Sequence, residues 1–214
     1  MPDLSFTVEG AKTVRFAASP QLALELRVAN APAGESIQAV VLRCQVQIDA
    51  PNRHYSDEEQ AGLRDLFGAP ERWGQTLRTV LWTQSTVTIP AFTDHVTVDV
   101  ALPCGYDFNL ATTKLFHALR EGEIPLTLLF SGTVFYAGAD DTLQVAQIPW
   151  SKETHYRLPV RVWKDTMDLY YPNSLFVPLR KDVFERLYGH KVRLGLPTWE
   201  QTVERLLERA GETR

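Results

Sequence analysis

Two cysteines are the side chains of this 214-residue chain best suited to nucleophilic or metal chemistry. Cys44 lies in VVLRCQVQID, residues 40–49, and Cys104 lies in LPCGYDFN, residues 102–109. A reactive thiolate needs a basic and partly exposed setting, whereas strand alternation places Cys44 on one face with Leu42 and Val46. We therefore expect Cys44 to pack in the core as a small apolar side chain. A structural role is also the favoured interpretation for Cys104, which falls in an expected strand-to-helix turn.

The sequence contains no motif for catalysis or for a bound cofactor. The two cysteines form no CxxC pair, and no histidine belongs to an HExxH motif. Neither a GxSxG nucleophile elbow nor a glycine-rich phosphate loop is present. We therefore expect no metal, no cofactor and no catalytic residues, and the sequence favours a protein that is not an enzyme.

One group of polar residues leaves a second interpretation open. Cys104, Asp107 and His117 lie close in sequence around an expected helix at residues 107–122. If their side chains converge between this helix and a sheet, they would line a pocket that binds a small ligand or supports hydrolysis. This alternative requires all three side chains to face one cavity.

Composition and charge describe an ordinary folded protein. Hydrophobic residues make up 44% of the chain and charged residues 22%, with a net charge of -4 and a pI near 5.8. This balance gives no electrostatic footprint for nucleic acid. No signal peptide and no run of about 18 apolar residues occurs, so we expect no membrane span and a cytoplasmic location with both thiols reduced.

Period-two alternation of apolar and polar residues dominates the first three quarters of the chain. Strands with one apolar face need a second layer to cover that face, so seven or eight of them predict two packed antiparallel sheets. The fold class is therefore mainly β within α+β, an antiparallel β-sandwich. The clearest alternating runs cover residues 22–28, 40–48, 87–89, 96–102, 126–136 and 156–162.

Helical patterns interrupt and follow these strands. The stretch YSDEEQAGLRDLFG carries a capping box, Ser56 with Glu59, and together with residues 107–122 predicts one or two inserted helices. After about residue 163 the period becomes helical, and residues 181–195 and 198–210 predict a hairpin of two helices. We expect a sandwich over residues 1–162 and a C-terminal helical segment, residues 163–214, packed on it.

The C-terminal segment is rich in aromatic and basic residues. Such side chains dock a helical hairpin onto a sheet, and they also dominate protein–protein hot spots, so the two interpretations stand together. The residues expected to bind a partner are Tyr171, Phe176, Arg180, Lys181, Tyr188, Lys191, Arg193 and Trp199.

Several phrases along the chain resemble an uncharacterised bacterial family, a domain of unknown function of about this length. They span residues 40–210: LRCQVQID, RHYSDEEQ, LFGAPERWGQTLR, CGYDFNLATTKLFHAL, GEIPLTLLFSGTVFY, QIPWSKETHYRLPV and GLPTWEQTVERLL. Genes of that family often lie near those of actinobacterial-type, high-affinity nickel-iron hydrogenases. The resemblance implies an accessory or assembly role for a hydrogenase, and it brings no catalytic residues to these positions.

The combined expectation is a non-enzymatic protein-binding module. On the resemblance, its partner would be a hydrogenase subunit or maturation factor. The C-terminal surface and an exposed sheet edge would supply the contact. Two alternatives stay open: the small-ligand or hydrolase site described above, and a structural homo-oligomer.

Overall fold

The computed structural model describes residues 2–31, 34–105, 110–138, 140 and 142–211. The chain forms two compact units, Met1–Ser174 and Leu175–Arg214, and each is described by itself. Among the described residues, no helix has the length and apolar character needed to cross a bilayer.

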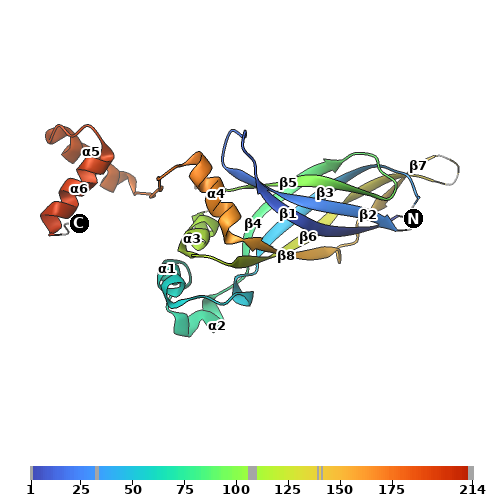
Figure 1. Ribbon diagram of the computed structural model, residues 1–214, viewed down its shortest axis with the longest axis horizontal. Coiled ribbons are helices and arrows are strands. Elements are labelled where there is room, and N and C mark those ends of the chain that lie inside the picture. The colour runs from blue at the N-terminus through green and yellow to red at the C-terminus, as the bar shows by residue number, and fades with distance from the viewer. Residues whose placement is uncertain (1, 32–33, 106–109, 139, 141, 212–214) are drawn as a thin grey trace. The chain divides into compact units, whose positions relative to one another are not determined.

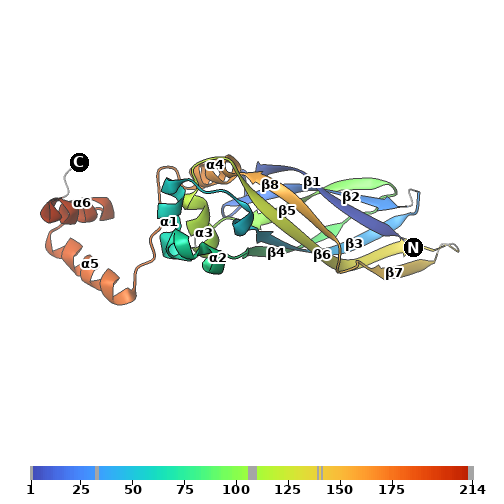
Figure 2. The ribbon, with the colours of Figure 1, turned by 90° about the horizontal axis from the view of Figure 1, so that it is seen from below.

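The first unit is built on two antiparallel sheets (Figures 1 and 2). One sheet has the order β1 (Asp3–Thr13), β2 (Gln21–Ala31), β5 (His95–Pro103). The other has the order β4 (Val80–Ile89), β3 (Ile37–Ile48), β6 (Glu123–Ala137). The second edge of β6 pairs with β7 (Leu143–Gln147) along residues 133–137 and with β8 (Glu153–Pro159) along residues 123–129. The expected β-sandwich is confirmed.

The core lies between the two sheets, where the alternating apolar residues meet. Leu22, Leu24 and Leu26 of β2 are fully buried, and the rings of Phe6 and Phe130 stack across the sheets with centroids 4.2 Å apart. Burying a large apolar side chain is worth about 1.5–3 kcal/mol, so this interior supplies the main stabilisation of the fold.

Gly132 marks the closest approach of β6 to β3. Its φ of 145° lies in the region that only glycine adopts readily, and a Cβ there would clash with the backbone carbonyl of Val41. The approach of the two backbones therefore requires glycine at this position.

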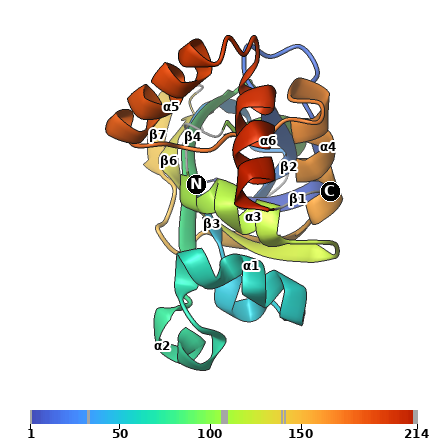
Figure 3. The same ribbon diagram turned by 90° about the vertical axis from the view of Figure 1, so that its left-hand side faces the viewer.

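Helices gather at one end of the sandwich, opposite the end that holds the N-terminus and β7 (Figures 1 and 2). They are α1 (Asp57–Phe67), α2 (Trp73–Thr76), α3 (Leu110–Ala118) and α4 (Val160–Tyr170), with single turns η1 (Ala50–Asn52) and η2 (Pro70–Arg72). The expected capping box of Ser56 and Glu59 begins α1, and Gly68 ends it. Helices α1 and α3 lie side by side, with Gly62 against Ala118 (Figure 3).

Helix α4 belongs to the sandwich unit. The buried Trp163 stacks on Phe116 of α3 at a centroid distance of 5.1 Å. The hydroxyl of Tyr170 donates to the carbonyl of Val14 and accepts from the amide of Ala17, which ties α4 to the end of β1. The first compact unit therefore extends to Ser174, beyond the expected sandwich of residues 1–162.

The second unit is a pair of helices, α5 (Lys181–Arg193) and α6 (Trp199–Ala210), as expected from the periodicity (Figure 3). Gly195, with φ of 63°, turns the chain between them, and the hydroxyl of Thr198 caps α6 by accepting from the amide of Gln201. Packing of this hairpin on the sandwich stays a prediction.

Candidate functional site: an interaction surface

Both thiols are held in the neutral form. Cys44 is 1% exposed among core aliphatics and Cys104 is also buried, and burial raises the pKa of each to about 12. A neutral thiol is neither a good nucleophile nor a metal ligand. Within the described ranges, no three His, Cys, Asp or Glu side chains are grouped to hold a metal ion. The expected core role of Cys44 is confirmed.

The alternative pocket is only partly described. The thiol of Cys104 lies 3.5 Å from the carbonyl oxygen of Leu102. His117 is exposed, with its ring edge-on to Trp163, and burial of part of the ring together with the charge of Lys164 lowers its pKa. Asp107 lies outside the described residues. A site formed by Cys104, Asp107 and His117 therefore stays a prediction.

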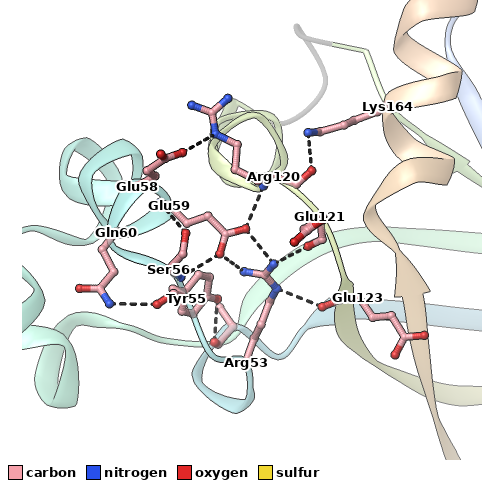
Figure 4. A network of polar contacts seen from close by, with 11 residues as sticks. Arg53, Tyr55, Ser56, Glu58, Glu59, Gln60, Arg120, Glu121, Glu123 and Lys164 are labelled. Carbon is pink, nitrogen blue, oxygen red and sulfur yellow. Dashed lines mark hydrogen bonds and ion pairs between the residues drawn. The ribbon is translucent and has the colours of Figure 1, made fainter.

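A charged cluster joins α1 to the chain after α3 (Figure 4). The guanidinium of Arg53 donates to both carboxylate oxygens of Glu59 at 2.9 Å, and to the carbonyls of Glu121 at 2.8 Å and Glu123 at 3.0 Å. Glu59 also accepts from the backbone amides of Ser56 and Arg120.

We call this cluster the clamp, because Arg53 and Glu59 pair with each other and both bind the backbone after α3. The side chain of Arg53 is 9% exposed, and that of Glu59 is buried as well. Burial alone would raise the pKa of Glu59, but the hydrogen bonds from Arg53 and the two amides outweigh it and lower that pKa. With its oxygens already engaged, Glu59 has little capacity left for a ligand.

The C-terminal unit differs from the sandwich in having no apolar interior. In its described part, residues 175–211, no apolar side chain is buried, and Thr202 is the one buried residue. Phe184, Tyr188 and Trp199 touch one another, with centroids 5.3–6.4 Å apart, yet each stays at least 36% exposed. These three rings therefore form an exposed aromatic cluster on the C-terminal unit.

The residues expected to bind a partner are distributed over both units. Phe176 and Tyr188 are about half exposed, and Lys191 lies over the ring of Trp199 at 5.7 Å. Arg180 and Lys181 are paired with acidic neighbours, Arg193 is exposed on α5, and Tyr171 is half-buried against the core of the first unit.

A groove of about 710 Å³ runs along α5. Its apolar lining comes from Val183, Leu187 and Leu206. Gly189 also lines the groove, and a Cβ at that position would meet no other atom within 4 Å. Its polar lining is basic: Arg186, His190 and Arg193. Arg193 is one of the residues expected to bind a partner, and the spacing of i, i+4 and i+7 places Arg186 and His190 on the same helix face.

The sandwich carries a second, smaller apolar surface near β7. Leu143 and Val145 of β7 are more than half exposed, and Trp150, in the turn before β8, is 91% exposed. β7 ends its sheet in the described topology. The expected exposed sheet edge is therefore present. Trp150 was not among the residues expected to bind a partner.

Together these features define a protein with a β-sandwich unit and a second unit of two helices, both of which expose large apolar side chains. The chain belongs to a family of unknown function, DUF6084, whose model matches residues 1–214. A search of the curated proteins found no match.

Among solved structures, the chain is similar to a late embryogenesis abundant (LEA) protein at 12% identity and a TM-score of 0.31, covering 74% of this chain and 72% of that one. It is similar to the ApaA protein from Bordetella pertussis at 15% identity and a TM-score of 0.25, covering 74% and 95%. For β-glucosidase 3B from Thermotoga neapolitana the identity is 12% and the TM-score 0.27, with 73% of this chain and 17% of that one covered. Scores of this size support no inference about function.

Proposed function

We propose that this protein is a non-enzymatic binding module, and that its C-terminal unit contacts the partner protein. One observation carries the proposal: residues 175–211 contain no buried apolar side chain, whereas twelve large apolar side chains between Leu175 and Leu207 are exposed. A unit of about 40 residues rarely folds stably without a further contact, so these side chains need a surface to cover them.

The nature of the partner is proposed from the family resemblance. A hydrogenase subunit or maturation factor is the expected client, and the protein would act on it by holding it rather than by supplying metal. For such a role we expect a cytoplasmic location. A protein that holds its partner without supplying metal needs no thiolate ligand, and burial keeps both thiols neutral.

Co-purification from native cells tests this proposal. The full chain is compared with a full-length variant, Phe176→Ala with Tyr188→Ala, in which two exposed aromatic contacts are removed. Loss of an aromatic hot spot costs about 2 kcal/mol or more, so recovery of a hydrogenase subunit or maturation factor should fall at least about tenfold.

The control variant is Phe16→Ala, because Phe16 is fully exposed and lies in the sandwich unit. It should recover the same partners as the unchanged chain. Undiminished recovery by the C-terminal variant would show that this unit is not the contact.

A further inference from the structure

The groove on α5 has a chemistry that specifies its occupant. We propose that it binds an acidic amphipathic helix of the partner protein, with an apolar side chain over Gly189 and carboxylates against Arg186, His190 and Arg193. This inference rests on the proposed function and adds the kind of segment that is recognised.

The basic side chains of α5 differ in whether they form ion pairs in the described part of the chain. The cations that begin α5 are paired, Arg180 with Asp182 at 3.0 Å and Lys181 with Glu185 at 3.8 Å. No ion pair of Arg186 or Arg193 occurs among the described residues, although acidic residues are present on both helices. Two unpaired guanidinium groups beside an apolar floor favour a ligand that carries carboxylates.

His190 adds an independent observation. Its Nε2 atom is buried and has no hydrogen-bond partner among the described residues, and the residue lines the groove. A buried polar atom without a partner costs about 1–3 kcal/mol, so the hairpin as described leaves one polar group beside the groove unsatisfied. The C-terminal dipole of α5 explains cations in the last turn, but it does not explain Arg186, which lies in the middle of the helix.

The spacing of the basic groups matches that of side chains along one face of a helix. Arg186, His190 and Arg193 follow one another at i, i+4 and i+7, so they span about 10 Å along α5. Carboxylates on a partner helix at the same spacing would meet all three groups, with apolar residues of the partner between them against Val183, Leu187 and Leu206.

A synthetic helix provides the probe. A fluorescein-labelled 18-residue peptide carries Leu at i, i+3, i+4 and i+7 and Glu on the remaining face, and a matched peptide has Lys in place of Glu. Fluorescence anisotropy with the full chain should show the Glu peptide binding at least about tenfold more tightly than the Lys peptide, with the difference shrinking at high salt.

Variants locate the binding. Arg186→Glu with Arg193→Glu should weaken binding of the Glu peptide at least about tenfold. The matched control, Arg180→Glu with Lys181→Glu, makes the same change of charge at the start of α5, outside the groove, and should weaken binding less than about threefold. Circular dichroism confirms that both variants keep their helices.

Three results would overturn the inference: equal binding of the two peptides, equal loss in the control variant, or a dimer in light scattering that the groove variant dissolves. The last result would assign the groove to α6 of a second copy, whose Glu200, Glu204 and Glu208 form an acidic row. If the aromatic variant loses the native partner but the groove variant keeps it, the groove inference fails while the proposed function stands.

Discussion

At the scale of single residues, burial and not sequence motif decides what the reactive side chains do. Cys44 and Cys104 have thiol pKa values near 12, because a thiolate in an apolar interior would lack solvation. We predict that neither thiol reacts with Ellman's reagent at pH 8 in the folded protein, and that both react once guanidinium unfolds it. A thiol that titrates within seconds in the native protein would contradict this.

The Arg53–Glu59 pair gives a second prediction at this scale. Glu59→Gln removes the charge that faces a buried guanidinium, so the free energy of unfolding at pH 7 should fall by about 3 kcal/mol. Glu58 pairs with Arg120 at 3.5 Å, and both side chains are mostly exposed. Glu58→Gln should therefore change the free energy of unfolding by less than about 0.5 kcal/mol. Urea denaturation of both variants measures the difference, and equal effects would contradict the clamp.

The pH dependence of the same pair follows from the lowered pKa of Glu59. A carboxyl whose pKa is lower in the folded state stabilises the protein above its unfolded value of 4.5 and loses that contribution as the pH falls through the folded value. The stability difference between the unchanged chain and Glu59→Gln should therefore be full at pH 6 and shrink below pH 4.5. A difference that stays constant down to acid unfolding would exclude this linkage.

At the scale of elements, local patterns predicted most strands and helices, because side-chain spacing follows backbone geometry. They did not predict β1, β7 or α2, and residues 160–162, expected to continue a strand, begin α4. Alternation placed Leu22, Leu24 and Leu26 on one face, and the Ser56–Glu59 capping box located the start of α1. The clamp was not predictable in this way. It brings Arg53, Glu59 and the amide of Arg120 together across about 60 residues, and no local spacing signals such a contact.

The contact between β3 and β6 provides the prediction at this scale. Gly132→Ala should lower the free energy of unfolding by about 3 kcal/mol, because the methyl group meets the Val41 carbonyl at a positive φ. Gly74→Ala, in α2 with open space around it, should be neutral or slightly stabilising. Matching denaturation curves for the two variants would show that β6 does not approach β3 this closely.

At the scale of the whole molecule, the two units differ in how many apolar side chains they bury. The sandwich unit holds all the buried apolar side chains, while the described part of the C-terminal unit holds none. The sequence predicted the helices of that unit from their period. It could not predict how exposed they are or that His190 keeps a buried nitrogen unpaired, since both depend on packing between α5 and α6.

This division predicts unequal local stability. Amides of α5 and α6 should exchange hydrogen at least about a hundredfold faster than those of β2, β3 and β6, because few buried contacts oppose opening of the hairpin. Exchange of the full chain followed by mass spectrometry gives both rates in one sample.

The most direct test of the binding surface is the same exchange measurement repeated with the co-purified partner bound. The account predicts that the partner slows exchange in residues 175–211 and leaves the strands of the sandwich unchanged. Slowing confined to β7 and the turn that carries Trp150, with the helices exchanging as in the free protein, would contradict it.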